Sequence, residues 1–240
     1  MKINIIHEDK HIIVCEKPHG IATQSKRIGS PDMVNLLKNH LHQAAAPETS
    51  KEPYLAVIHR LDQPVRGILV FAKTPSAARE LNRQLQQGGF GKYYRALVNG
   101  TPKHSEGLLE NYIVKDAKTN TSRICTKDTP GAKTAKLRYK TIGDTNRFFA
   151  PVQDTAKTFT ELEIKLDTGR HHQIRCQFAH IGCPIVGDTK YNPHCCLNKS
   201  WQQIRLCAYR LSFAHPVTHK LLCYELPQEK NIAFHTSRAE

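Results

Sequence analysis

One carboxylate lies where polar chemistry interrupts an apolar part of the sequence. Asp62 belongs to the charged segment HRLDQP, in which His59 and Arg60 precede it, and short apolar runs flank the segment on both sides. A nearby cation favours the ionised carboxylate, and an ionised, partly desolvated aspartate acts as a nucleophile or general base. Aspartate also caps turns at strand ends, and the local sequence alone leaves both roles open.

Lys92-Tyr93-Tyr94 places a cation beside two aromatic rings. Aromatic faces stack on nucleic-acid bases, and each stacked base contributes about 1–3 kcal/mol to binding. Two tyrosines on a half-buried strand give the same sequence pattern. The segment is therefore compatible both with base recognition and with packing.

The segment GRHHQIR, residues 169–175, is expected to open a helix. Arg170 and Gln173 are three positions apart and would share one helix face. Arg175 directly follows an apolar residue, so we expect it at a buried edge, where it needs a partner such as Asp62. The alternative is a solvated basic helix face that binds phosphate.

Apolar runs and alternation predict the elements that carry these groups. Short apolar runs predict strands on either side of Asp62 and a strand that contains Tyr94, and strict alternation predicts a further half-buried strand. Arg175 falls within an expected helix. These elements are expected at residues 54–58, 67–72, 93–98, 159–167 and 171–180.

The rest of the chain adds strands and helices in no regular βαβ order. Thr74 is expected to be the N-cap of a helix that Pro75 opens. Residues 115–135 contain few large apolar groups and predict a mobile loop or an irregular hairpin. We expect an α+β fold, a mixed or mostly antiparallel sheet flanked by helices, in a single domain over 1–240. The other expected elements are two strands within 3–16, helices at 31–45 and 74–87, and strands at 205–213 and 221–226.

The charge balance indicates the kind of partner. The 240 residues contain 35 Lys and Arg against 21 Asp and Glu, a net charge of +14. Such an excess favours a polyanion, and nucleic acid comes first because no apolar stretch approaches the roughly 18 residues of a spanning helix. With 39% hydrophobic and 23% charged residues, the composition is neither that of a disordered chain nor that of a membrane protein. A soluble protein that is merely basic is the plainer alternative.

Eight cysteines are scattered along the chain, and only two of them are adjacent. No secretory signal begins the sequence, so we expect reduced thiols in the cytoplasm that serve as small buried hydrophobic groups. A zinc site is an alternative, but its candidates lack the paired CxxC spacing of structural zinc sites, so no metal is expected. Those candidates are His180, Cys183, His194, Cys195 and Cys196.

Taken together and in order, these blocks resemble the signature of the RluA-type pseudouridine synthases. The HRLD segment with Gly67 and the following Phe71-Ala72-Lys73-Thr74 resembles the central motif of that family. HRLD alone would be a weak signal, but the ordered combination is specific and covers roughly residues 5–227. The other matching blocks are Lys17-Pro18-x-Gly20, Lys92-x-Tyr94-x-Ala96, Gly169-Arg170-x-His172-Gln173-Ile174-Arg175, Gly182-x-Pro184-Ile185-x-Gly187-Asp188, Leu206-x-Ala208 and His215-Pro216.

The resemblance implies a long, bent, mostly antiparallel sheet and the isomerisation of uridine in RNA to pseudouridine, with neither cofactor nor metal. It implies that Asp62 is the catalytic aspartate, that Tyr94 packs on the target base and helps to remove the proton on carbon 5, and that Arg175 pairs with the aspartate. Arg60 corresponds to an arginine that can fill the space left by a flipped base. We expect the substrate to be bound by His59, Arg60, Arg170, Gln173 and Leu206, of which Leu206 lines the uracil pocket.

Two positions depart from the family pattern. Arg66 replaces a small or modest side chain, and Cys207 stands where histidine is common. No separate N-terminal RNA-binding domain is expected, so the catalytic domain itself must hold a tRNA or rRNA substrate, as a monomer. Two alternatives are a noncatalytic RNA-binding module and a basic nuclease. The paired carboxylates of metal-assisted phosphate cleavage are missing near the motifs.

Overall fold

A computed structural model of the chain describes residues 3–25, 29–44, 52–143, 148–149, 158–192 and 203–228. Within these ranges, three helices and eleven strands follow one another without a repeating βαβ unit. The helices are α1 (Met33–Ala44), α2 (Pro75–Gln86) and α3 (Gln173–His180). The strands are β1 (Asn4–Glu8), β2 (Ile12–Lys17), β3 (Ala56–Val57), β4 (Arg66–Ala72), β5 (Gly91–Asn99), β6 (Glu106–Asp116), β7 (Thr121–Cys125), β8 (Lys133–Thr141), β9 (Phe159–Leu166), β10 (Leu206–Ala214) and β11 (Leu221–Glu225).

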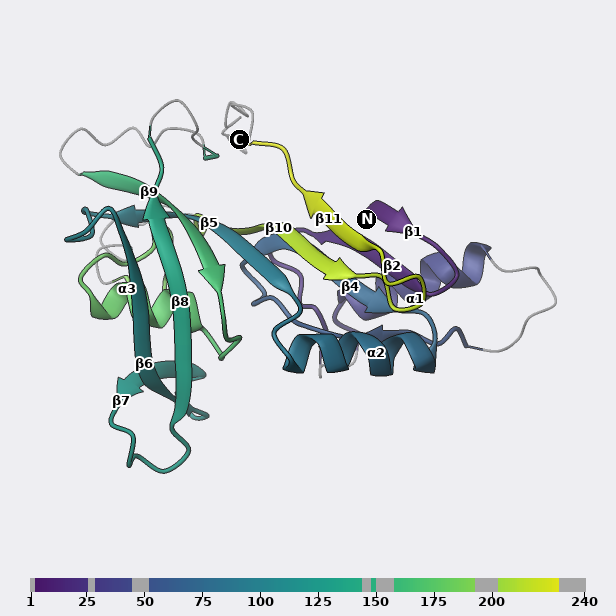
Figure 1. The fold of residues 1–240 in the computed structure, drawn as a ribbon, viewed down its shortest axis with the longest axis horizontal. Helices are drawn as coiled ribbons and strands as arrows, with labels where there is room; N and C mark the ends of the chain where they lie inside the picture. Colours follow the sequence, from purple (N-terminus) through teal and green to yellow (C-terminus); the bar gives the residue numbers. More distant parts are fainter. Residues whose placement is uncertain are drawn as a thin grey trace, which may run out of the picture.

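All the described strands belong to one sheet, in the order β1-β2-β4-β10-β5-β9-β8-β6-β7, with β3 added on β4 and β11 on β10. Among the described pairs, only β4 and β10 run parallel. The mixed, mostly antiparallel sheet flanked by helices was predicted from the sequence and is confirmed. Figure 1 shows the sheet along the length of the molecule, with the β6–β7 hairpin projecting at one end.

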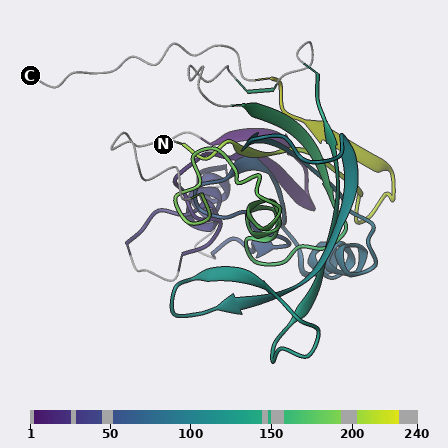
Figure 2. The same cartoon turned by 90° about the vertical axis from the view of Figure 1, so that its left-hand side faces the viewer.

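The two faces of the sheet bury two separate apolar cores. On β2, Ile13 packs on the side of α1 and α3, whereas its neighbour Ile12 packs on the side of α2. The same alternation on β4 sends Leu69 and Val70 to opposite cores, as the two-residue period of a strand requires. Figure 2 shows α3 within the curve of the sheet. The chemistry-bearing blocks lie on the face covered by α1 and α3.

The predicted helix at 74–87 is confirmed in detail. The Thr74 side chain accepts a hydrogen bond from the Ala77 N–H at 3.2 Å, and Pro75 occupies the first turn. Its buried residues Ala78 and Leu81 face the sheet.

Two expectations about individual elements need correction. Of the two alternatives for residues 115–135, the mobile loop is wrong and a hairpin is present, but it is regular, because the stretch contains the end of β6, all of β7 and the start of β8 in a continuous ladder. Its side chains are polar because these strands are partly exposed to solvent on both faces of the sheet. The helix expected at 171–180 begins only at Gln173, because His172 adopts a left-handed conformation with φ of 50°.

Gly67 lies where the strand after Asp62 crosses β10. Its φ is +151°, and a Cβ there would lie 2.4 Å from the Ala208 Cβ and 2.5 Å from the Ala208 carbonyl oxygen. Only glycine permits this approach, which brings the end of the Asp62 loop against β10. Leu206 begins the same strand β10.

Candidate active site

A pocket with a cavity volume of about 90 Å³ opens between the Asp62 loop, β5, the start of α3 and β10. It gathers residues that are far apart in the sequence, and seven of the eight expected site residues line it. His59 is the exception, because it lines a second hollow beside the pocket. The seven are Arg60, Asp62, Tyr94, Arg170, Gln173, Arg175 and Leu206.

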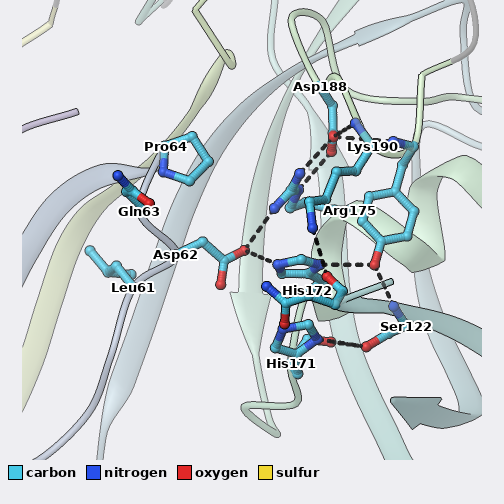
Figure 3. Close-up of polar contacts among 12 residues, drawn as sticks. Leu61, Asp62, Gln63, Pro64, Ser122, His171, His172, Arg175, Asp188 and Lys190 are labelled. Carbon is cyan, nitrogen blue, oxygen red and sulfur yellow. Dashed lines mark hydrogen bonds and ion pairs between the residues drawn. The ribbon is translucent and has the colours of Figure 1, made fainter. Parts of the chain in front are cut away.

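Asp62 and Arg175 are in direct contact, as the sequence suggested. The Arg175 Nη1 donates to the Asp62 Oδ2 at 3.2 Å (Figure 3). The rest of the guanidinium binds Asp188, through Nε to Oδ2 and Nη2 to Oδ1, both at 2.7 Å. Asp188 is fully buried, whereas the Asp62 side chain keeps 26% of its surface exposed. Arg175 is therefore anchored on one carboxylate and presents its remaining edge to the other.

The charge of Arg175 is stabilised by this arrangement. Burial opposes the charged form, but the hydrogen bond to Asp188 and the charges of Asp188 and Asp62 outweigh it and raise the pKa of the guanidinium. A permanently protonated arginine therefore donates a charge-assisted hydrogen bond to Asp62. The sequence predicted the arginine but missed Asp188. Its place 13 residues after Arg175, in the block that ends Gly187-Asp188, was the available signal.

A second chain of contacts reaches Asp62 from the β6–β7 hairpin. The Ser122 N–H donates to the Tyr191 hydroxyl oxygen at 2.6 Å, and that hydroxyl lies 2.9 Å from the His172 Nδ1 (Figure 3). The hydroxyl keeps its own proton, which it can donate to Nδ1. In that tautomer the ring proton of a neutral His172 is on Nε2, which lies 3.6 Å from the Asp62 Oδ2.

The pKa values agree with this assignment. Burial is the largest influence on His172 and lowers its pKa to about 4, although the charge of Asp62 acts in the other direction. Burial likewise raises the pKa of Tyr191 to about 12. At neutral pH the imidazole is therefore uncharged and the phenol is protonated, so His172 offers Asp62 an N–H without adding charge. Sequence reasoning assigned no role to His172, Tyr191 or Ser122.

The Lys17 side chain holds the backbone of the Asp62 loop through hydrogen bonds. This fully buried ammonium donates to the carbonyl oxygens of Pro18 at 2.9 Å, Ile21 at 2.7 Å and Gln63 at 3.0 Å. Burial lowers the pKa of Lys17 to about 7, while the charge of Asp62 opposes that shift. Three acceptors use all three donors of the protonated amine. The loop is thus fixed to the segment that follows β2.

Tyr94 forms part of the apolar side of the pocket, together with Leu206 and Ile174. Its side chain is buried, and burial followed by the charge of Asp62 raises the pKa of the phenol well above its ordinary value. Tyr94 is therefore a neutral phenol at physiological pH. A planar base would meet a flat ring and aliphatic groups, with Asp62 at the edge.

The remaining expected binding residues differ in whether their polar groups already have hydrogen-bond partners within the protein. Gln173 is occupied, because its Oε1 accepts from the Arg170 N–H at 3.0 Å and the Thr168 hydroxyl at 2.8 Å, while its Nε2 donates to the Lys136 carbonyl. Arg60 is exposed and donates to the Gln24 side chain at 3.0 Å. Gln173 therefore shapes the loop that carries Arg170, and Arg60 reaches the mouth of the pocket.

His59 is turned toward the sheet. Its Nε2 accepts from the Val70 N–H at 3.3 Å, and its ring lies edge-on to Phe90. Burial, followed by the nearby charge of Lys92, lowers the pKa of His59 to about 3. This neutral imidazole supports the start of the Asp62 loop.

Neither departure from the family pattern disturbs the pocket. Arg66 forms an ion pair with Glu16 on the neighbouring strand β2, and Cys207 is buried in the core on the α2 side. In the part of the chain that the structure describes, no three His, Cys, Asp or Glu side chains are grouped to hold a metal ion. His194, Cys195 and Cys196 lie outside the described residues. Among the described helices, none is long and apolar enough to cross a bilayer.

Comparisons with known proteins converge on one family. The family model described as RNA pseudouridylate synthase matches residues 11–180. The chain is 31% identical over 233 residues to an uncharacterized RNA pseudouridine synthase of Aquifex aeolicus (strain VF5), covering 94% of this chain and 69% of that protein. It is 32% identical over 241 residues to ribosomal large subunit pseudouridine synthase D of Neisseria meningitidis serogroup B, covering 97% of this chain and 60% of that protein.

Two solved human structures have a similar fold. RNA pseudouridylate synthase domain containing 4 matches with a TM-score of 0.72 at 20% identity, over 95% of this chain and 89% of that one. RNA pseudouridylate synthase domain containing 1 matches with a TM-score of 0.70 at 19% identity, over 94% and 83%. The fold expected from the resemblance is confirmed.

Proposed function

Because the chain belongs to the RNA pseudouridylate synthase family, it isomerises uridine in RNA to pseudouridine, and we propose that Asp62 is the residue that begins the reaction. The contact that carries this proposal is the Arg175 Nη1 at 3.2 Å from the Asp62 Oδ2, with Arg175 fixed on the buried Asp188. It places a permanent positive charge beside a carboxylate at the edge of a pocket with apolar walls.

In the proposed reaction, the target nucleotide leaves the RNA stack and enters the pocket. Extruding a base costs a few kcal/mol, which stacking on Tyr94 and phosphate contacts offset. Asp62 attacks the nucleotide or takes a ribose proton while the glycosidic bond breaks. The freed uracil stays between Tyr94 and Leu206, rotates, and rejoins the ribose through carbon 5, and this step either displaces Asp62 from the ribose or lets Asp62 return the ribose proton. Carbon 5 then loses its proton, and the nitrogen that was bonded to the ribose gains one.

Tyr94 and Arg60 have separate proposed tasks. Tyr94 packs on the base and assists removal of the carbon-5 proton, as a neutral phenol because its pKa is raised. Arg60 is exposed at the mouth of the pocket, where it can occupy the space that the flipped base leaves in the RNA.

The substrate is a tRNA or an rRNA in this proposal. The name of the Neisseria relative refers to the large ribosomal subunit, which makes rRNA the first RNA to test. The net charge of +14 supplies phosphate contacts from the catalytic domain itself. We propose that the chain acts as a monomer in the cytoplasm and as one catalytic domain over 1–240.

Tritium release from RNA labelled at carbon 5 of uridine tests the role of Asp62. Wild-type protein should release tritium from total RNA of cells that lack the protein, and Asp62→Asn should reduce release to background. Asp128→Asn changes an exposed acid in the β7–β8 turn and should leave activity intact. Release by Asp62→Asn at the wild-type rate would refute the assignment.

Site-resolved pseudouridine mapping of the same RNA, with and without the protein, identifies the target. A site present only with the protein names both the RNA and the position. Tight RNA binding by the wild type with no converted uridine anywhere would instead favour a noncatalytic RNA-binding module.

A further inference from the structure

The second hollow, which we call the side cleft, extends from the reaction pocket along β5. It shares Asp62, Tyr94 and Arg170 with that pocket, and Lys92 and Leu85 line its far part. Its cavity volume is about 690 Å³, compared with about 90 Å³ for the reaction pocket. One flipped nucleotide in the reaction pocket therefore leaves the side cleft unfilled.

Lys92 is the cation at the centre of the side cleft. It lies two residues before Tyr94 on β5, so both side chains emerge on the same face of the sheet. Its Nζ lies 3.5 Å from the place that a Cβ would take on Gly169, against the turn that leads to Arg170. Within the described ranges, the ammonium has neither a hydrogen bond nor an ion pair within 4.0 Å.

Arg170 also lines the side cleft, and no carboxylate pairs with its guanidinium among the described residues. Its Nε donates to the Thr134 carbonyl oxygen at 2.9 Å, which fixes the plane of the guanidinium. Its backbone N–H is held by Gln173 at 3.0 Å, which fixes the loop. In the part of the chain that the structure describes, its two terminal nitrogens make no hydrogen bond to protein.

The two cations are close enough to oppose each other. Burial is the main cause of the lowered pKa of Lys92, the charge of Arg170 lowers it further, and the charge of Asp167 acts against the shift. The Asp167 carboxylate lies 3.6 Å from Arg138, so its charge is shared with another cation. An anion between Lys92 and Arg170 would remove this repulsion and supply the missing acceptors.

We infer that Lys92 and Arg170 bind a backbone phosphate of a nucleotide next to the target uridine, whose base and ribose lie in the side cleft against Leu85. The inference rests on the proposed function, because the reaction pocket is taken by the flipped uridine itself. RNA has a phosphate at every nucleotide. When one nucleotide of an RNA strand enters the reaction pocket, the phosphate of its neighbour must therefore lie close to the mouth of that pocket. The side cleft is the hollow that continues from that mouth.

Binding of a labelled single-stranded RNA nonamer, one uridine between two runs of four adenosines, tests the subsite. The affinity is measured by fluorescence anisotropy over a series of KCl concentrations. Lys92→Met should weaken binding about tenfold, as expected for a lost charge-assisted contact. The slope of log K against log salt should fall by about 0.7, the value for one phosphate contact to single-stranded RNA. Lys92→Arg retains the charge and should keep most of the affinity and the slope.

Lys10→Met is the matched control, because Lys10 is an exposed lysine in the turn between β1 and β2 at the sheet edge. The unfolding midpoint of Lys92→Met should equal that of the wild type, and its loss in tritium release should appear in KM more than in kcat. The inference fails if Lys92→Met matches Lys10→Met in affinity and salt slope. Inorganic phosphate at millimolar concentration should compete only weakly; full competition would mean a free-anion site instead.

The two proposals can fail separately. If the wild type binds the nonamer but converts no uridine in any RNA, the proposed function is wrong, whatever Lys92 does. If the wild type is active and Lys92→Met keeps the wild-type KM and salt slope, only the subsite is wrong.

Discussion

Replacing Asp188 by asparagine tests whether the Asp62 pair depends on a buried anchor. The substitution keeps the size of the side chain and removes one charge. The Asp188 Oδ1 accepts from the Arg175 Nη2 at 2.7 Å, the Lys190 N–H at 2.9 Å and the Tyr191 N–H at 3.2 Å, and an amide oxygen in that place can retain all three. The amide nitrogen would then face the Arg175 Nε, which now donates to Oδ2 at 2.7 Å. One strong hydrogen bond becomes a contact between two donors.

The cost follows from the burial of both partners. Arg175 is 3% exposed and Asp188 is 0% exposed, so the arginine cannot recover the lost contact from water. Breaking one side of a buried ion pair costs about 3–5 kcal/mol. Asp62 remains 3.2 Å from the guanidinium and still compensates part of the charge, so we expect the lower limit, about 3 kcal/mol. For a chain of this length that corresponds to a fall in Tm of about 6–12 °C.

Urea unfolding followed by circular dichroism measures this loss. The matched control is Glu110→Gln, whose partner Lys136 lies 3.2 Å away with both side chains substantially exposed. Pairs of that kind contribute less than about 1 kcal/mol. If Asp188→Asn and Glu110→Gln have the same free energy of unfolding, Arg175 is not anchored in the way described.

Two other outcomes follow from the structure. Gly67→Ala should destabilise the protein by at least about 2 kcal/mol through the clash with Ala208 and the strained φ; in urea unfolding, Gly143→Ala, with open space around it, serves as the control. A stability equal to that control would contradict the close approach. His59 and His172 have pKa values lowered to about 3 and about 4, against about 6.5 in an unfolded chain. They bind fewer protons when folded, so their contribution to stability is full above pH 6.5 and is lost as the pH falls to about 4 for His172 and to about 3 for His59. NMR should find both imidazoles neutral at pH 5.5, and an imidazolium signal from either would refute this.

The sequence predicted the contact between Asp62 and Arg175 because both residues occupied unusual surroundings. A carboxylate between apolar strands and an arginine after an apolar helical residue each needed a partner. The sequence did not show that Arg175 binds two carboxylates, with Asp188 on its Nε and Nη2 atoms and Asp62 on its Nη1 atom. This arrangement depends on the turn that follows α3, where Asp188 lies 13 residues beyond Arg175. Turn geometry of this kind leaves no periodic pattern.

The hairpin was harder to predict for a related reason. Strand β7 and the start of β8 carry mostly Thr, Lys, Ser and Arg, and the regular alternation of burial on β8 begins only at Ala135. Without an apolar face, a polar strand and a polar loop have the same composition. The left-handed His172 was equally hidden, because glycine is the residue that usually marks this conformation and histidine adopts it less often.

The link between Ser122 and Tyr191 uses the main chain of the hairpin, since its donor is a backbone N–H. A change of side chain at position 122 would therefore keep the link to Tyr191, proline excepted, although it would remove the separate hydrogen bond that the Ser122 hydroxyl donates to the His171 carbonyl oxygen at 2.8 Å. A one-residue insertion in β7 would break it at once, by moving a different N–H to that place. This contact therefore constrains the strand register of the hairpin and leaves its outward side chains unconstrained.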